Sequence, residues 1–251
     1  MKIFSFLEKF EIGISVVPFF IIILFSGYYK LFFTYFLITF IHELGHIIVA
    51  KMFKVKVNNM KLSVFGFSAN IDDYKYLSIY KQLLILLAGP LTYFISIFFI
   101  EKLYVYEIIS LVTYYKALLT NKYIFIFNLL PIFPLDGGRI IKIVLDKIFT
   151  YKKAKVLSNI ISIIFIILFI FYTGSHKQYL MYLFLIVNLI LNTVFIDREW
   201  RRFLVSRLYF NNKYPSKIHH KKDLYIYKDN YTIRKKELLN EKESVIFLLE
   251  D

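Results

Sequence analysis

The stretch LFFTYFLITFIHELGHIIVA, residues 31–50, combines the composition of a membrane helix with a cluster of ionisable groups. Its length is about the 20 residues that an α-helix needs to cross the hydrocarbon layer of a bilayer. Its only Asp, Glu, His, Lys or Arg side chains are His42, Glu43 and His46. An unpaired charge near mid-membrane costs at least about 2.5 kcal/mol, so three such groups on one turn need a common partner. A bound metal ion would be that partner.

The three residues form the pattern H-E-x-x-H. On a helix, residues four apart lie on one face, so His42 and His46 can point at one metal ion. Glu43 can then reach a water bound to that ion, whose pKa a catalytic zinc lowers to about 7. We therefore predict a zinc hydrolase in which Glu43 is the general base. Gly45 leaves room for the close approach of a neighbouring helix.

The whole chain has the composition of a membrane protein. Of its 251 residues, 58% are hydrophobic, and the mean hydropathy is +0.58, well above what a soluble globular domain needs. We expect an α-helical polytopic protein with about six transmembrane helices, because apolar stretches of suitable length recur. They are residues 12–29, 31–50, 82–100, 117–145, 156–175 and 178–196. The first stretch leads directly into the second, so we expect a retained helix and not a cleaved signal peptide.

The net charge of +14 indicates an orientation in the membrane. Clusters of Lys and Arg follow the second, fourth and sixth apolar stretches. The positive-inside bias places these connections, and with six spans both termini, in the cytoplasm. Basic loops account for most of the charge, so we expect no direct nucleic-acid binding. The chain has no cysteine, so any metal must be held by His and carboxylate side chains.

A second motif, NLLPIFPLDGGR over residues 128–139, interrupts another apolar stretch. Its two prolines and two glycines predict an unwound segment, which is tolerated at membrane depth where it lines a wet cavity. Asp136 is the outstanding candidate for a third ligand, which would complete a His₂Asp site for one zinc ion. Asn128 would either hold a substrate strand or tie down the broken helix. The remaining histidines, in a loop or a polar tail, are poor candidates: His176, His219 and His220.

Two regions outside the apolar stretches have patterns of their own. Residues 61–71 alternate between apolar and polar types, which predicts an extended segment or hairpin near the membrane surface. We divide the chain into a transmembrane metalloprotease core, residues 1–196, and a small cytoplasmic α/β tail, residues 197–251. Within the tail we expect strands over residues 224–227 and 244–249 and a helix over residues 233–242.

The two motifs together resemble those of the site-2 protease family of intramembrane zinc metalloproteases. The segment from His42 to His46 matches the first motif of that family, and residues 128–138 look like its second, N-x-x-P-x-x-x-L-D-G. Residues 88–90, Ala-Gly-Pro, are a short motif common in the family. The resemblance implies that Asp136 is the third zinc ligand. We name Asn128, Pro131, Phe65 and Gly66 as candidate substrate-binding residues.

Within the family, the chain looks most like the compact branch represented by the stage IV sporulation FB protease. That resemblance implies a membrane-associated sigma factor precursor of the pro-sigma-K type as substrate, and membrane inhibitory proteins as further partners. It also implies a location in the membrane surrounding the forespore. The cytoplasmic tail resembles a truncated CBS module.

Two other functions fit parts of the pattern. One is a membrane-anchored zinc protease that acts on soluble substrates, which also uses H-E-x-x-H. The other is a divalent-metal transporter with His and Asp along its pathway. A transporter needs no general base and would tolerate Glu43→Gln. For the intramembrane protease, we expect the strand near residues 64–71 to pair with an unwound substrate.

Overall fold

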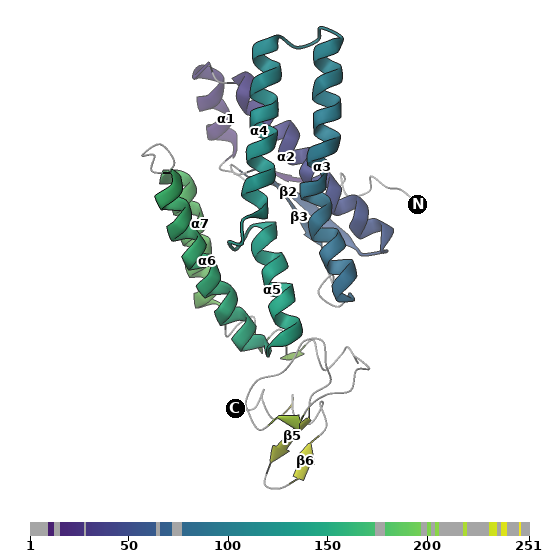
Figure 1. The fold of residues 1–251 in the computed structure, drawn as a ribbon, viewed down its shortest axis with the longest axis vertical. Coiled ribbons are helices and arrows are strands. Elements are labelled where there is room, and N and C mark those ends of the chain that lie inside the picture. The colour runs from purple at the N-terminus through teal and green to yellow at the C-terminus, as the bar shows by residue number, and fades with distance from the viewer. Residues whose placement is uncertain are drawn as a thin grey trace. The chain divides into compact units, whose positions relative to one another are not determined.

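The computed structural model describes residues 10–12, 16–27, 29–63, 66–71, 77–173, 179–196, 200–201, 204–205, 218–219, 231–234, 237–239 and 246. They are mostly helical (Figure 1). The chain divides into two compact units, Met1–Leu129 and Leu130–Asp251. The boundary that we expect between residues 196 and 197 stays a prediction.

The first unit combines four helices with a small sheet. In chain order these are β1 (Phe10–Ile12), α1 (Val16–Phe25), α2 (Tyr29–Met52), β2 (Val57–Ser63), β3 (Gly66–Ile71), α3 (Ile79–Val105) and α4 (Leu111–Leu129). The sheet order is β1-β2-β3, with β1 parallel to β2 and β2 antiparallel to β3. The expected hairpin is therefore confirmed. Gly66 begins β3 with a φ of +113°, a conformation that favours glycine.

The sheet packs against α2 through alternate residues of β2. Met60 is buried against Ile47 of α2, and Leu62 is buried against Phe36 of the same helix. Lys61, which lies between them, is exposed. This alternation is the period of two expected for a strand with one covered face. It places the hairpin beside the turn of α2 that carries the H-E-x-x-H pattern.

Helices α3 and α4 form a hairpin. The rings of Tyr104 and Tyr114 stack with centroids 4.6 Å apart near the turn between the helices. Further along, the buried Asn121 of α4 donates a hydrogen bond from Nδ2 to the carbonyl oxygen of Tyr93, at 3.0 Å. A polar side chain that bonds across two apolar helices is a common way to hold such helices together in membranes.

The second unit holds α5 (Asp136–Ile148), α6 (Tyr151–Thr173) and α7 (Tyr179–Val194), followed by β4 (Ile218–His219), β5 (Tyr231–Arg234) and β6 (Glu237–Leu239). Helix α6 packs against both α5 and α7. The three strands form a second sheet in the order β4-β5-β6, in which β5 and β6 are antiparallel.

The prediction of a helix over residues 233–242 of the tail is wrong for those residues of this range that the structure describes. Arg234 pairs with Glu237, and Ile233 with Leu238, so β5 and β6 are antiparallel strands there. The sequence Tyr-Thr-Ile before Arg234 is rich in β-branched and aromatic residues, which favour strands. The strand expected at residues 224–227 lies outside the described residues. Ile246, the one described residue of the other expected strand, is helical.

Three helices in the described part of the chain are long and apolar enough to cross a membrane, namely α2, α3 and α6. The first expected stretch is not one long helix, because Ile12 belongs to β1 and α1 has only 10 residues. The fourth is divided between α4 and α5, as its prolines predict. The count of six spans stays a prediction.

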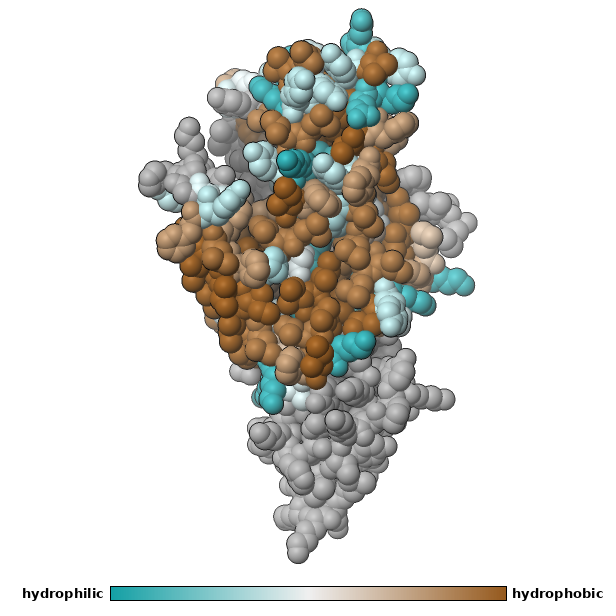
Figure 2. Space-filling model, viewed as in Figure 1, coloured by the Kyte–Doolittle hydropathy of each residue, from teal (hydrophilic) through white to brown (hydrophobic). Residues whose placement is uncertain are grey.

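Apolar side chains cover most of the described surface visible in Figure 2. On α6, for example, Ile163 and Phe171 are exposed, whereas Ser162 is fully buried. Buried polar groups below an exposed apolar surface reverse the arrangement of a water-soluble protein. This arrangement is the one expected for helices that face lipid.

Candidate metal centre

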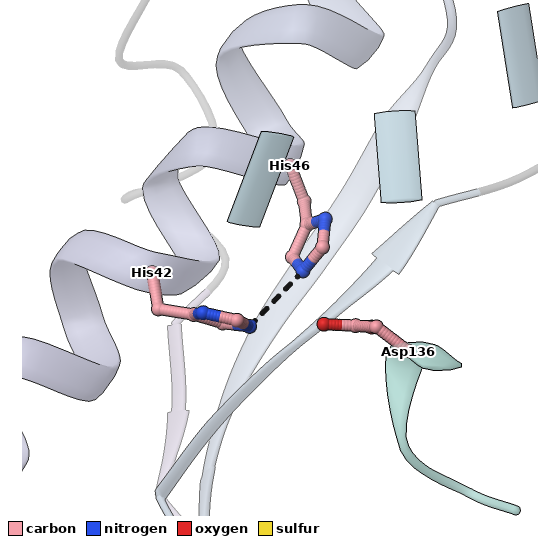
Figure 3. Close-up of side chains that lie close together, drawn as sticks. All are labelled: His42, His46 and Asp136. Carbon is pink, nitrogen blue, oxygen red and sulfur yellow. Dashed lines mark hydrogen bonds between the residues drawn. The ribbon is translucent and has the colours of Figure 1, made fainter. Parts of the chain in front are cut away.

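The two histidines of α2 lie on the buried side of that helix. The Nε2 atoms of His42 and His46 are 3.3 Å apart (Figure 3). A tetrahedral zinc ion with Zn–N bonds of about 2.0–2.1 Å places two ligand nitrogens about 3.3–3.4 Å apart. The observed separation therefore fits two ligands of one zinc ion.

Helix α3 sets the orientation of the His46 ring. Its Nδ1 lies 2.7 Å from the carbonyl oxygen of Ile85. A carbonyl only accepts hydrogen bonds, so Nδ1 carries the proton and Nε2 is left to bind a metal. The pattern H-E-x-x-H did not indicate Ile85, because a backbone carbonyl has no signature in the sequence.

Two glycines allow α2 and α3 to approach each other. A Cβ atom at Gly89 would lie 2.1 Å from Nε2 of His46, so a side chain there would occupy the space of the imidazole ring. A Cβ atom at Gly45 would lie 2.6 Å from the carbonyl oxygen of Ala88. The close helix approach predicted at Gly45 is confirmed. This explains the glycine of the Ala-Gly-Pro motif, which makes room for the His46 ring.

Glu43 faces the sheet. The backbone N–H of Ala69, in β3, donates a hydrogen bond to Oε1 of Glu43 at 2.5 Å. The carboxylate is half-buried and therefore lies between the helix and the strand. This contact joins the predicted general base to the segment that we expect to bind substrate. The sequence did not indicate Ala69, because its N–H is a backbone group.

Asp136 begins α5 directly after the interrupted segment. The segment is held by local bonds, one of which runs from the Leu135 N–H to the Ile132 carbonyl at 2.9 Å. A Cβ atom at Gly138 would lie 2.4 Å from the carbonyl carbon of Ile132, so only glycine lets the first turn of α5 pack against the segment. The peptide bond between Phe133 and Pro134 is cis. The predicted unwinding is confirmed, and the Asp136 side chain is buried.

The three predicted ligands come together. One ligand atom each from His42, His46 and Asp136 lies within 4.8 Å of the other two, and Figure 3 shows the side chains pointing toward one another. Two imidazole nitrogens and one carboxylate oxygen are a donor set that suits zinc and leaves a coordination position open. The residues present therefore fit the metal.

The other predicted site residues have different outcomes. The Nδ2 of Asn128 donates to the Ile124 carbonyl of its own helix at 3.0 Å, which matches the role of tying down the broken helix. Pro131 is half-buried in the interrupted segment, and Gly66 begins β3. Phe65 lies outside the described residues, as do two of the three other histidines. Those two are His176 and His220, whereas His219 belongs to β4.

Comparisons with known proteins agree with this geometry. The sequence matches Peptidase family M50 over residues 30–108 and 95–171. Stage IV sporulation protein FB of Bacillus subtilis is 28% identical over 207 residues, which cover 78% of this chain and 69% of that protein. A zinc metalloprotease of Methanocaldococcus jannaschii is 36% identical over 124 residues, or 48% of this chain and 36% of that protein.

A solved structure, the site-2 protease from Methanocaldococcus jannaschii, has the same fold. The TM-score is 0.55 at 28% sequence identity, and the alignment covers 73% of this chain and 89% of the other. The match to the family includes α2 and Asp136 and decides against a metal transporter. This chain is therefore an integral membrane zinc metalloendopeptidase of the site-2 type, and it belongs to Peptidase family M50.

Proposed function

We propose that this protease cleaves a membrane-associated sigma factor precursor of the pro-sigma-K type and thereby releases the active factor. The proposal is supported by the likeness to Stage IV sporulation protein FB, which extends over most of the chain. The corresponding location is the membrane that surrounds the forespore. Membrane inhibitory proteins belong to the same proposal as partners.

The site residues have distinct roles in this reaction. His42, His46 and Asp136 hold one zinc ion. This assignment rests on the positions of their ligand atoms, which lie within 4.8 Å of one another. A zinc ion held by these residues would acidify a bound water and polarise the scissile carbonyl. Glu43 accepts a proton from the attacking water and delivers it to the amide nitrogen as the C–N bond breaks.

The free edge of β3 is the proposed binding site for substrate. In the described part of the chain, β3 has a strand partner on one side only, which is β2. The Ala69 N–H donates a hydrogen bond to the Glu43 carboxylate. An extended substrate segment can add to this edge, and its carbonyl can take the Ala69 N–H in place of the carboxylate. Glu43 is then released beside the bound peptide. Phe65, Gly66, Asn128 and Pro131 are the proposed lining residues.

The proposed topology has six spans, with both termini in the cytoplasm, a core of residues 1–196 and a cytoplasmic tail of residues 197–251. Because the chain has no cysteine, a thiol reagent can label only a cysteine that is introduced. Single cysteines at Lys56 and Ser110 therefore show on which side of the membrane each position lies. We expect an impermeant maleimide to label Lys56→Cys from the cytoplasmic side only and Ser110→Cys from the other side only. The reverse pattern would overturn the orientation.

The catalytic proposal is tested by Glu43→Gln in liposomes that contain the sigma factor precursor. We expect cleavage to fall by about 10²–10⁴-fold, because the general base is lost, while one zinc per chain is retained. Glu101→Gln makes the same change at an exposed position of α3 and should leave cleavage unchanged. Full cleavage by Glu43→Gln would end the assignment of the base. If the wild-type protein cleaves another membrane protein but leaves the sigma factor precursor intact, the assignment of the substrate is wrong.

The strand-addition proposal is tested by Ala69→Pro, which removes the N–H while proline remains tolerated on an edge strand. We expect kcat/KM to fall about 10-fold, the scale of one lost hydrogen bond to a charged or strongly polar partner, with zinc content unchanged. Ala69→Gly keeps the N–H and serves as the control. Equal kcat/KM for the two variants would show that substrate does not use this edge.

A further inference from the structure

Helix α6 buries a polar stripe, defined here as Lys155, Ser158, Asn159 and Ser162. These residues recur at the three- and four-residue spacing of one helix face. The side chains of Ile160, Ile163, Ile164 and Ile167, by contrast, are exposed. Lys155 is only 2% exposed, although lysine is among the residues least often buried. A buried cation in a membrane helix suggests a functional role, because its desolvation must be offset by specific partners.

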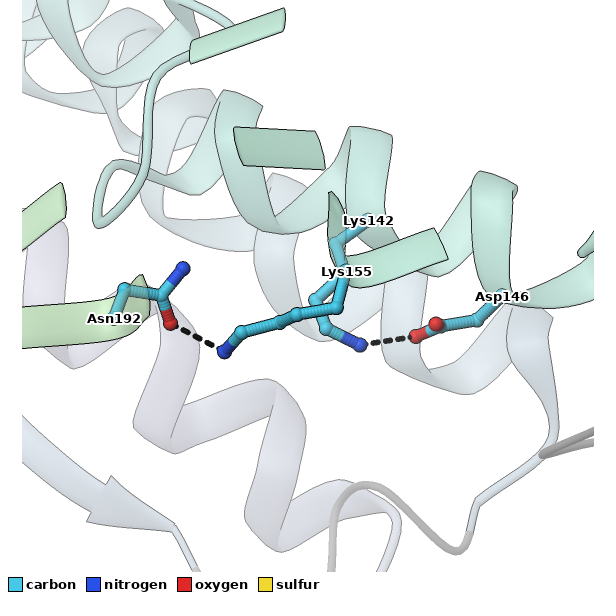
Figure 4. Close-up of polar contacts among 4 residues, drawn as sticks. All are labelled: Lys142, Asp146, Lys155 and Asn192. Atoms are coloured by element: carbon cyan, nitrogen blue, oxygen red, sulfur yellow. Dashed lines mark hydrogen bonds and ion pairs between the residues drawn. The ribbon is translucent and has the colours of Figure 1, made fainter. Parts of the chain in front are cut away.

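The stripe is joined to α7. The Nζ of Lys155 donates a hydrogen bond to Oδ1 of Asn192, as Figure 4 shows. The Nδ2 of Asn192 in turn donates to Oδ1 of Asn159 at 2.7 Å. These two bonds fix the side-chain amide of Asn192 in one orientation, and they hold the lysine on the buried side of α6.

The same stripe reaches the segment that carries Asp136. The Phe133 N–H donates a hydrogen bond to Oγ of Ser162 at 3.0 Å, and the Ser162 hydroxyl donates to the Ser158 carbonyl at 2.9 Å. The Nζ of Lys155 lies 5.7 Å from the centroid of the Phe133 ring, within reach of a cation–π interaction. Both the backbone and the ring of Phe133 therefore contact α6, three residues before Asp136.

We propose that Ser162 and Lys155 are positioning residues for the metal ligand Asp136. The interrupted segment has no regular helix or strand to define its path, so its position depends on side chains that satisfy its backbone groups. Ser162 satisfies the Phe133 N–H on one side, and Gly138 lets α5 pack against Ile132 on the other. The stripe thereby holds the carboxylate of Asp136 where a zinc ion needs it. This inference rests on the proposed role of Asp136 as a ligand.

The test is the zinc affinity of purified protein, measured by competition with a chelator and therefore independent of proteolysis. We expect Ser162→Ala to weaken zinc binding about 10-fold, the lower end of the effect seen when groups that support metal ligands are lost. Ser96→Ala is the matched control, because Ser96 is also 2% exposed or less and its Oγ has no hydrogen-bond partner among the described residues. We expect the control to bind zinc as wild type does.

A double variant separates positioning from a general loss of packing. If Ser162 acts through Asp136, Ser162→Ala should cause no further loss of zinc affinity once Asp136→Ala is present. Wild-type zinc affinity in Ser162→Ala, or an equal loss with and without Asp136, would overturn the inference. If Asp136→Ala itself left zinc affinity unchanged, the proposed ligand set would fail instead.

A second variant keeps the test decisive if Ser162→Ala does not fold. Lys155→Met keeps most of the length of the side chain and removes its charge, its bond to Asn192 and its cation–π contact with the Phe133 ring. We expect zinc binding about 3-fold weaker, a smaller effect than for Ser162→Ala because the Phe133 N–H keeps its partner. Unchanged zinc affinity in this variant would show that Lys155 is not a positioning residue.

Discussion

The histidine ligands of α2 and the aspartate ligand of α5 reach the same metal centre by different physical routes. His42 and His46 stand one turn apart on a continuous helix, so the helix itself sets the distance between them. Asp136 follows an interrupted segment, and its place is set by Ser162 and Gly138. A site built partly on broken backbone therefore also depends on a group outside the recognisable motif, here Ser162.

The largest effect is expected on the histidine side, from Gly89→Ala. The new methyl group would lie 2.1 Å from Nε2 of His46, so the imidazole must leave its position. We expect zinc affinity to fall about 100-fold in a chelator competition measurement. Leu87→Ala is the control, because Leu87 lies at an exposed position of α3, the helix that also carries Gly89. Zinc binding of wild-type strength in Gly89→Ala would mean that Nε2 of His46 is not a ligand.

A smaller effect is expected on the aspartate side, from Gly138→Ala. Its methyl group would lie 2.4 Å from the carbonyl carbon of Ile132, and the segment must shift to admit it. We expect zinc affinity to fall about 10-fold, because both histidines remain in place. If zinc affinity fell further in Gly138→Ala than in Gly89→Ala, the interrupted segment would be the main determinant of the site.

The smallest effect is expected from Asn121→Leu, which touches neither side. The substitution removes the bond from Asn121 to the Tyr93 carbonyl, and such bonds between membrane helices average about 0.6 kcal/mol. We expect a loss of that order in the free energy of unfolding, measured by denaturant titration in micelles, with zinc affinity unchanged. A change in zinc affinity would show that the bond between α3 and α4 also supports the metal centre.

Much of the site could be predicted from local chemistry. The H-E-x-x-H pattern places two imidazoles on one helix face whatever surrounds the helix. Pro131 and Pro134 interrupt a helix by removing backbone donors, which is also a local effect, and the break between α4 and α5 follows it. Asp136 could be selected because it is the carboxylate beside that break.

Other features could not be predicted from local patterns. The tail segment at residues 233–242 is compatible with a helix by its charged residues, yet β5 and β6 pair there, because the preference of a segment for a strand depends strongly on its packing context. The bond from Asn128 to the Ile124 carbonyl could likewise not be predicted, because a backbone carbonyl has no signature in the sequence.

The amino-acid sequence by itself determined the chemical identity of the metal centre. With no cysteine, two histidines one turn apart and one aspartate at a helix break, the available donors are nitrogen and carboxylate oxygen. Only the tertiary structure decided what supports those donors, namely the Ile85 carbonyl, the space at Gly89 and the Ser162 hydroxyl. It also decided that the Ala69 N–H bonds to Glu43. The physical reason is that backbone groups and empty space have no side chain to identify them. Their role exists only once packing brings distant segments together.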